Sequence, residues 1–571
     1  MDLKKISYPD YTGKIRYKIV IDGHELTEKY RQLIVSISSQ CGLNKISSLE
    51  LIMNNDLIDV EKKFYLSDDN TIDTHKNIEV YVGYEKASNC IFKGIIVKKN
   101  VSKLCTILTI TAKHEAEKLT RVRKMISYEN DKDDNIIQSI CSKENIKCNI
   151  EKTKASPERI VQYNSTDWDF INMRAEANGL LLYTNEKGIV ARAPQYEKVN
   201  LNLIKGYNII DIEEEIDIRH SHINSYVEKK WDDSEQEVTD TSSSSKNLTQ
   251  SKDEQGETQE IINLGTQETD STTNVLLESK SIRNDLSYLK GKITTIGYAP
   301  IEPCDIVELH EIGKSFNGKV IVSNVIHSLK SGVWETRLEI GYDDTPYVSK
   351  YDNIAEKPAM GTSIGVNGLQ YAKIEGLEGD PLNKGRIYIS LIGLPDTKLW
   401  ARLATFDAGN NRGSFFIPEK NDEVIVGFID NNPNQPIILG SLHSSKSKQP
   451  HEVKDNNTIK GYVSKGNIKI TIDDDNKALF FETPGGNKLS LNDKDKGIIL
   501  EDQNGNKITL NDQGISIESQ KAITIKSTQD VNLEGNNTTI KANAQLKAQG
   551  MASEVSATGN TVIKGGIVQI N

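Results

Sequence analysis

The chain has 571 residues, a length typical of about three or four domains. Its net charge is −11, its pI is about 5.5 and no basic stripe stands out, which argues against a nucleic-acid-binding protein. The N-terminal stretch MDLKKISYPDYTGK lacks the apolar core of a signal peptide, and no apolar run is long enough to span a membrane. We therefore expect synthesis in the cytoplasm without a signal peptide.

The first 110 residues alternate between apolar and polar side chains, as in IRYKIVIDG, NIEVYVGYE and CTILTITAKH. This period is typical of half-buried strands, and it predicts a β-barrel or sandwich over 1–110. His114 and Glu115 resemble the start of a zinc-protease helix, but the second histidine is missing, so no metal site is expected there.

Residues 111–228 mix helix and strand signals. Asp134–Ser142 is predicted to be an amphipathic helix. A second helix begins at a capping box at Thr166 and ends at Gly179. His220 and His222 lie two residues apart on a predicted strand, but without a third ligand a structural role is favoured over a metal site. The six cysteines form no C-x-x-C pair and are expected to be reduced structural thiols.

Residues 229–280 are polar, acidic and rich in Ser and Thr, with almost nothing to bury. This composition predicts a solvated, flexible insertion, and a role in surface recognition is the alternative. Strand patterns return over 281–350, in GKITTIGYAP, GKVIVSNVIHSL and WETRLEIGY, and predict a second β-barrel.

The segment 351–445 contains a series of specific motifs: GRIYI from Gly385, WARLA from Trp400, AGNNRGSFFIP from Ala408, DEVIVGF from Asp422 and NPNQPIILGSL from Asn432. Together they resemble the OB-fold of the VgrG family, the spikes of type VI secretion and of related phage-tail-like contractile injection systems. The chain departs from the family pattern at 420–422, which alters one turn. The stretches 162–183 and 316–341 resemble the hub of the same family.

An OB-fold is a closed barrel of five strands whose loops often bind oligosaccharide or nucleic acid. Nucleic acid is not expected here, since the chain is acidic and has no basic groove lined with aromatic residues. Asn410, Asn411 and Arg412 have the chemistry to contact a glycan, but a structural turn between strands is the favoured interpretation. Residues 446–465 are a short polar neck, too short for a lysozyme-type domain.

The last segment, 466–571, repeats a pair of apolar residues two positions apart at intervals of about eight residues, separated by Gly, Asn, Asp and Ser. Each unit predicts one short strand and one turn, with both apolar residues on one face. Such a face suits three chains wound together, in which every strand is paired by a neighbouring chain and the apolar pairs fill the axis. A single-chain solenoid and a disordered tail are the alternatives.

The predicted axis residues are the larger apolar residues of these pairs. They are Leu489, Leu491, Ile498, Leu500, Ile508, Leu510, Ile515, Ile517, Ile523, Ile525, Val531 and Leu533. Smaller alanines follow Leu533 and predict a narrower core toward the end.

The resemblance implies a mainly β protein: a hub of β-barrels with a few helices, an OB-fold, and a C-terminal intertwined triple-stranded β-helix in a homotrimer. It implies a non-enzymatic, puncturing spike and hub that joins a hexameric inner tube to a needle. Its implied partners are an Hcp-like inner tube, baseplate proteins, a PAAR-type tip protein, possible effectors and, transiently, the target membrane. No cofactor is implied, and delivery outside the cell is expected. The motifs do not separate type VI secretion from an extracellular particle or a phage tail.

Two other functions stay open at this point. A phage-like peptidoglycan hydrolase needs a pair of carboxylates across a sugar-binding cleft, for which no segment outside the structural ones is available. A trimeric adhesin fits the needle but not the OB and hub motifs.

The strand pattern continues to the end of the chain, so the needle is predicted to finish as a blunt triangle with open strand edges. The family usually covers this end with a small conical PAAR-type protein. The predicted docking residues are Gly565, Gly566, Ile567, Val568, Gln569, Ile570 and Asn571. The alternative is that these residues only finish the trimer.

Overall fold

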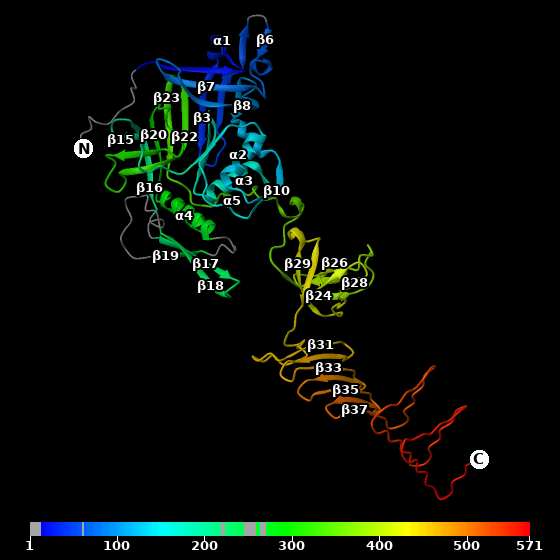
Figure 1. Cartoon of the computed structure of the whole chain (residues 1–571). Helices are drawn as coiled ribbons and strands as arrows, with labels where there is room; N and C mark the ends of the chain where they lie inside the picture. Colours follow the sequence, from blue (N-terminus) through cyan, green and yellow to red (C-terminus); the bar gives the residue numbers. More distant parts are fainter. Residues whose placement is uncertain (1–12, 60–61, 218–222, 245–257, 263–269, 571) are drawn as a thin grey trace. The chain divides into compact units, whose positions relative to one another are not determined.

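The computed structural model describes residues 13–59, 62–217, 223–244, 258–262 and 270–570. The chain divides into two compact units (Figure 1). The first contains the residues up to Gly368 together with Phe428–Pro436, and the second contains Leu369–Gly427 and Ile437–Asn571. Both are built mainly from strands, as the sequence predicts.

The first strand-rich region forms a large antiparallel sheet in which alternate residues enter the core. In β4, for example, Leu49, Leu51 and Met53 are buried. The elements are β1 (Ile15–Ile21), β2 (His24–Glu25), α1 (Glu28–Arg31), β3 (Ile34–Gly42), β4 (Ser48–Asn54), β5 (Asp56–Asp59), β6 (Lys62–Tyr65), β7 (Asn77–Tyr84), β8 (Asn89–Ser102) and β9 (Ile107–Lys113). The predicted alternation of strands over 1–110 is therefore confirmed.

Two helices and several short strands follow. They are β10 (Arg123–Glu129), α2 (Asp133–Lys143), β11 (Cys148–Ile150), β12 (Arg159–Thr166), α3 (Asp167–Ala177), β13 (Leu181–Asn185) and β14 (Gly188–Arg192). Both predicted helices are confirmed. The Thr166 hydroxyl accepts a hydrogen bond from the Asp169 amide at 3.1 Å and caps α3, and Gly179 follows the helix with a φ of +69°.

The second strand-rich region has a hydrophobic core of its own, is joined to the first region by backbone pairing, and includes strands from outside the predicted segment 281–350. Its strands are β15 (Val199–Ile204), β16 (Ile209–Ile216), β20 (Leu289–Ile296), β21 (Ile306–His310), β22 (Gly318–Lys330) and β23 (Val333–Ile340). Two of them come from the segment predicted as α+β. All of them belong, with β1 to β4 and β7 to β9, to one 13-stranded sheet.

The long strand β22 joins the two regions. Its first part pairs with β21 at Ile306↔Ile321, and its second part pairs with β3 from Asn324↔Gly42 onward. Along the other edge of β22, the pairing with β23 continues, with a register shift between Val322 and Asn324 at the point where the partner changes from β21 to β3. The alternation of apolar and polar residues does not predict this change of partner, because both halves of β22 have the pattern of an ordinary strand.

The polar insertion is more ordered than its composition predicts. The described residues form β17 (Ile223–Asp232), β18 (Glu237–Ser244), β19 (Thr258–Ile262) and α4 (Asp270–Leu286). α4 packs on the sheet, where Tyr226, Val227 and Leu277 are buried. The described residues of 229–280 therefore form strands and a helix instead of a flexible loop. Trp231, Val238 and Ile261 are exposed, as expected of a solvated segment, whereas Leu277 of α4 is buried. His220 and His222 lie outside the described residues.

The second unit begins with a closed barrel whose strand order is β24-β25-β26-β30-β29. Its strands are β24 (Gln370–Gly376), β25 (Ile387–Leu391), β26 (Leu394–Leu403), β29 (Glu423–Phe428) and β30 (Pro436–Ser441). Ala372, Ile374, Val424, Val426 and Ile438 fill the interior. The predicted five-stranded barrel is confirmed. A short helix, α5 (Tyr347–Lys350), precedes it in the first unit, and a hairpin of β27 (Ala408–Gly409) and β28 (Arg412–Gly413) extends from it.

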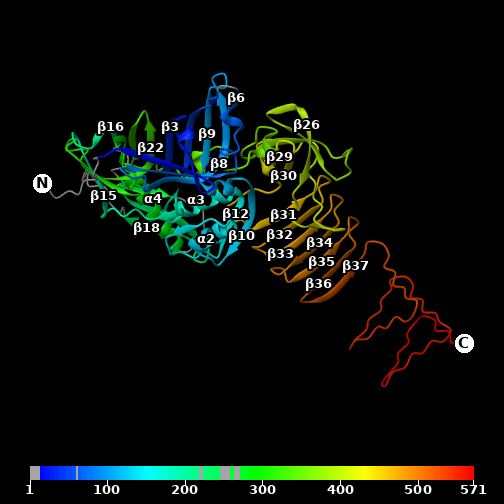
Figure 2. The ribbon, with the colours of Figure 1, turned by 90° about the horizontal axis from the view of Figure 1, so that it is seen from above.

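The barrel is followed by a seven-stranded antiparallel sheet (Figures 1 and 2). Its strands are β31 (Ile459–Val463), β32 (Lys469–Asp473), β33 (Ala478–Glu482), β34 (Lys488–Asn492), β35 (Gly497–Glu501), β36 (Lys507–Asn511) and β37 (Gly514–Glu518). β31 lies in the segment predicted as a neck. No strand is described over 519–570.

The repeating unit of strand and turn is confirmed up to Glu518, but its pairing differs from the prediction. Each strand pairs with the next strand of the same chain, as in Leu489↔Leu500, instead of with a neighbouring chain. The turns explain this, because the Asp502 carboxylate accepts hydrogen bonds from the Asn504 and Asn506 amides at 2.8 and 2.9 Å and reverses the chain.

Two histidines of the first unit make its stability depend on pH. Burial lowers the pKa of His327 to about 4 from an ordinary value of 6.5. The unfolded chain therefore binds one more proton than the folded chain between these values. The stabilisation is complete above pH 6.5 and is lost as the pH falls toward 4, at about 1.4 kcal/mol per pH unit. His114, whose pKa burial also lowers to about 4, acts in the same direction.

We predict that His327→Gln makes the unfolding free energy of the first unit less dependent on pH between 6 and 5, by about one proton. Denaturant unfolding at both pH values measures this slope. Exposed His24→Gln is the control and should keep the slope of the unmodified chain. Equal slopes for both variants would contradict the assignment.

Candidate functional site

The C-terminal sheet carries two rows of apolar side chains on one face, which we call the apolar rows. The first consists of Ile472, Leu479, Leu491, Ile498, Leu510 and Ile515. The second consists of Ile470, Phe481, Leu489, Leu500, Ile508 and Ile517. Because cross-strand partners share a face, the antiparallel register places each apolar residue opposite another. The eight predicted axis residues between Leu489 and Ile517 all lie in these rows.

The apolar rows are not covered within the chain. The exposed fraction is 38% for Leu491 and 41% for Ile498, and it rises to 72% for Ile515 and 56% for Ile517. Contiguous apolar surface of this kind marks an interaction site in a soluble protein. The rows run the length of the sheet, so a partner that covers them must be equally long.

The remaining predicted axis residues, Ile523, Ile525, Val531 and Leu533, follow the last strand. They are 53%, 71%, 53% and 69% exposed. Since no strand is described over 519–570, the backbone groups of this segment lack the sheet pairing that such groups normally have. A partner that supplies strands would satisfy the backbone and cover the side chains together.

The predicted docking residues at the chain end are also exposed. Ile567 is 86%, Val568 48% and Ile570 83% exposed, and Gly565, Gly566 and Gln569 are exposed as well. Asn571 lies outside the described residues.

The apolar pairs identified from the sequence leave out two apolar residues that lie on the opposite face of the sheet. Phe480 stands opposite Thr471 and Ser490, and Ile499 stands opposite Ser490 and Thr509. The signal was present as three consecutive apolar residues in LFF and IIL, where the strict alternation breaks. Both side chains are half-buried.

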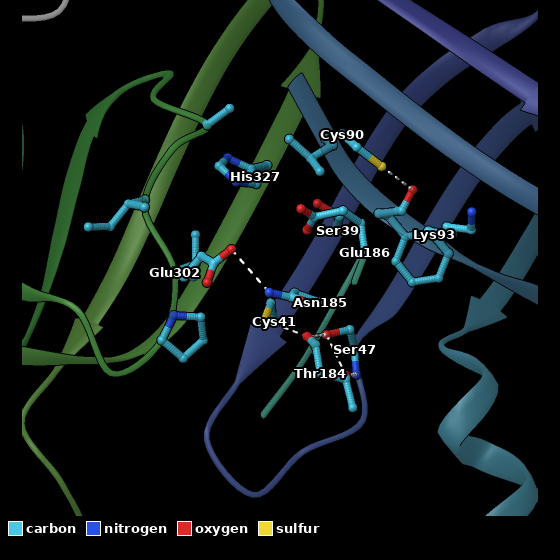
Figure 3. A pocket seen from close by; sticks show the side chains of 16 residues that line it. Ser39, Cys41, Ser47, Cys90, Lys93, Thr184, Asn185, Glu186, Glu302 and His327 are labelled. Atoms are coloured by element: carbon cyan, nitrogen blue, oxygen red, sulfur yellow. Dashed lines mark hydrogen bonds between the residues drawn. The ribbon is translucent and has the colours of Figure 1, made fainter. Parts of the chain in front are cut away.

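The first unit contains a cavity of about 50 Å³ that is lined by both polar and apolar side chains (Figure 3). Cys41 and His327 both line it and would be the candidates for a thiol nucleophile and its base. Burial raises the pKa of Cys41 to about 12 and lowers the pKa of His327 to about 4, so both groups stay neutral. A reactive cysteine needs the opposite, a lowered thiol pKa.

A larger cleft of about 730 Å³ is lined by Glu79, Lys93, His114 and Glu115 among others. A glycoside hydrolase would need a carboxylic acid there whose pKa is raised. Instead, hydrogen bonds from Tyr81 and Lys93 lower the pKa of Glu79. This arrangement does not favour acid catalysis.

The hairpin that contains Asn410, Asn411 and Arg412 is a compact turn. Arg412 Nη1 donates to the Asp407 carboxylate oxygens at 2.9 and 3.0 Å, and Asn411 has a φ of +54°. The guanidinium is thus engaged within the turn. Among the described residues, no cluster of three or more His, Cys, Asp or Glu side chains is placed to hold a metal ion. No described helix is long and apolar enough to cross a membrane.

Three family models match the chain. Residues 12–331, more than half of it, match the Alg8 N-terminal domain. Residues 371–443 match the type VI secretion system/phage-baseplate injector OB domain. Residues 478–563, which include most of the apolar rows, match the phage baseplate V C-terminal trimerisation domain.

Individual relatives are similar over shorter stretches or at low identity. The type VI secretion system spike protein VgrG5 of Pseudomonas aeruginosa is 32% identical over 102 residues, which cover 16% of this chain and 13% of that protein. A 43 kDa tail protein of prophage MuSo2 from Shewanella oneidensis is 13% identical, with a TM-score of 0.45 over 58% of this chain and 99% of that one. An Escherichia coli component of the type VI secretion system is 12% identical, with a TM-score of 0.37 over 75% of this chain and 100% of that one.

The barrel and the C-terminal sheet match two models specific to spikes and baseplates, and the remaining match covers the N-terminal half. The chain therefore belongs to the VgrG family of spike proteins, with an N-terminal region of the Alg8 type.

Proposed function

We propose that the protein is the homotrimeric puncturing spike and hub at the tip of a contractile injection machine. The observation that carries this proposal is the pair of uncovered apolar rows, which coincides with the match to a trimerisation domain. Three copies cover each other's rows if each sheet forms one wall of a triangular prism. The twelve row residues then meet at a dry axis, and their burial stabilises the assembly by roughly 25 cal/mol per Å² of apolar surface.

The segment 519–570 completes this needle by winding around the same segment of the other two chains in the trimer. Its apolar residues continue the same spacing, and its backbone requires strands from another chain. We place the intertwined triple-stranded β-helix here, beyond the sheet in which each chain pairs with itself. The domain limits predicted from sequence remain part of this proposal: hub 1–350 with the insertion 229–280, OB-fold 351–445, neck 446–465 and needle 466–571.

The first unit would act as the hub. Each copy would contribute its two strand-rich regions, which share β22, to a ring. Three copies would then present six such regions to a hexameric inner tube of the Hcp type. Baseplate proteins would surround this ring. Assembly in the cytoplasm and delivery outside the cell follow from this role, with transient contact with the target membrane.

The open end of the needle would carry a PAAR-type tip protein, through which effectors are attached. The supporting observation is the exposure of Ile567 and Ile570 at the chain end. Uncovered apolar ends and strand edges invite aggregation, so a capped end is expected.

The proposed role is mechanical, without a cofactor and without catalysis. The alternative is a spike with peptidoglycan hydrolase activity. The lowered pKa of Glu79 in the larger cleft and the neutral Cys41 and His327 in the smaller one argue against these three residues as catalysts. Glu214, whose pKa burial raises to about 7 beside a third cleft, is the carboxyl group that the hydrolase alternative would use as an acid.

The trimer is tested by Ile517→Asp, which places three carboxylates together at the proposed axis. We expect the trimer to lose about 3–5 kcal/mol of stability, because unpaired buried charges are costly. Light scattering and thermal unfolding at pH 7.5 measure the loss, and part of it should return at pH 4, where the carboxyl groups bind protons.

Ser516→Asp is the matched control, since Ser516 stands opposite Thr509 on the other face of the same strand. It should leave the trimer unchanged. A monomeric unmodified chain, or equal effects of the two substitutions, would contradict the proposal.

Deleting residues 565–571 tests the tip. We expect the trimer to persist, because the axis residues remain, while binding of a PAAR-type protein falls at least tenfold. Pull-down and light scattering on the same sample report both properties. Undiminished binding would place the tip protein elsewhere on the spike.

Purified protein should not clear peptidoglycan in a turbidity assay. The variant Glu79→Gln serves as the control for the carboxylate that lines the larger cleft. Clearing by the unmodified chain that disappears in the variant would establish the hydrolase alternative.

A further inference from the structure

Two cysteines of the first unit, Cys141 and Cys148, lie seven residues apart in the sequence and meet in the same core. Cys141 lies near the end of α2 and is fully buried, whereas Cys148 begins β11 and is partly exposed. Cys141 belongs to the hydrophobic core that contains Ile137 and Ile171, and Cys148 packs against it. The mechanical role proposed above uses neither thiol.

The turn at the end of α2 brings the two residues together. The Ile146 amide donates to the Cys141 carbonyl at 2.9 Å, and the Asn145 amide donates to the Ser142 carbonyl at 3.1 Å. Asn145 has a φ of +56°, so the helix ends in a Schellman motif that reverses the chain. In β11, Cys148 then points to the same side as the buried residue two positions further on, which faces the core.

The two thiols are in direct contact. The Cys141 thiol donates a hydrogen bond to the Cys148 sulfur, which lowers the pKa of Cys148 and raises the pKa of Cys141. The thiols of Cys41, Cys90 and Cys304 donate to backbone carbonyls instead. Because the thiolate is the reactive form of cysteine, Cys148 is the better nucleophile of the pair.

We infer that Cys141 and Cys148 form an oxidation site, at which an oxidant that carries a disulfide converts the two thiols into one intramolecular disulfide. This inference rests on the proposed function, because delivery outside the cell would take the chain from a reducing to an oxidising environment. Most residues of the turn between the cysteines are exposed, so an oxidant can approach Cys148 from this side. Cys141 is buried behind it and acts second.

The reaction is a pair of thiol–disulfide exchanges. The Cys148 thiolate attacks one sulfur of the oxidant, whose disulfide breaks and releases a first thiol that takes up the proton from Cys148. The Cys141 thiol then gives up its proton and attacks the Cys148 sulfur, which releases the second thiol of the oxidant with that proton. The two cysteines together lose two electrons, and the oxidant gains them.

The new bond would tie the end of α2 to β11. A disulfide requires a sulfur separation of about 2.0 Å, so the two sulfurs must move closer than a hydrogen bond places them. The turn 142–147 is short and exposed, and it can adjust while the core stays in place. A covalent link across this turn restricts the unfolded chain and should raise the unfolding temperature of the first unit.

The site is tested on full-length protein that carries Cys105→Ser, which removes the exposed thiol in the turn between β8 and β9. The protein is incubated with oxidised glutathione, the remaining thiols are blocked with N-ethylmaleimide, and the peptides are identified by mass spectrometry. We expect a Cys141–Cys148 disulfide without bound glutathione. It should form at least about tenfold faster than any modification of the buried thiols, which are Cys41, Cys90 and Cys304.

Two single substitutions separate the roles of the pair. Cys141→Ala should leave glutathione bound to Cys148, because the thiol that completes the reaction is missing. Cys148→Ala should leave Cys141 reduced, because Cys141 is buried. Unmodified Cys148 in the protein that retains both cysteines, or glutathione that persists on Cys148 beside an intact Cys141, overturns the inference.

Thermal unfolding gives a second measurement. The oxidised protein should unfold roughly 2–4 °C above the reduced protein, and the double variant Cys141→Ala/Cys148→Ala should show no such difference. An equal shift in the double variant overturns the inference. Light scattering on the same samples reports the trimer separately: a trimer that forms no Cys141–Cys148 disulfide contradicts the inference alone, whereas a monomer that forms it contradicts the proposed function and leaves the thiol chemistry standing.

Discussion

The structure depends on an apolar face that one chain does not cover. The antiparallel register of β32 to β37 aligns apolar residues into two rows, and nothing described in the second unit packs over them. Contact between these rows and water is unfavourable for the isolated chain. In the proposed trimer the copies would cover each other's rows, and the width of two apolar residues per strand would limit the shared core to a narrow axis.

The first unit obeys a different constraint, because its two strand-rich regions have separate cores but share the strand β22. Leu329 of β22 and Trp334 of β23 pack into the core of the first region, whereas Val320 and Val322 of β22 belong to the core of the second. The two regions of one copy are therefore coupled by packing and by backbone hydrogen bonds. In the proposed ring of three copies, this coupling would transmit load without a hinge between the two regions of each copy.

Strand and helix positions followed from local patterns, whereas strand partners did not. The ends of α3 were predictable because the Thr166 hydroxyl caps its first turn and Gly179 adopts the positive φ that follows its last turn. Pairs such as Leu489 and Leu491 likewise predict a strand with one apolar face. The alternation does not reveal which strand pairs with it. The same apolar face would be buried whether the paired strand came from the same chain or from a neighbouring chain. For the same reason, the sharing of β22 by two regions was not predictable. The packing of α4 against β17 and β18 was not predictable either, because the segment 229–280 is polar.

The change at Glu518 separates two stages of assembly. Up to β37 the chain satisfies its own backbone through neighbouring antiparallel strands, which are local contacts that form quickly and at any concentration. Beyond β37, no strand is described up to residue 570, and pairing there requires other copies. In the proposed trimer, the sheet would therefore form first in each chain, and its exposed rows would bring three copies together in register. The segment 519–570 would then wind up from an aligned base, which would confine slow, concentration-dependent pairing to the end of the needle.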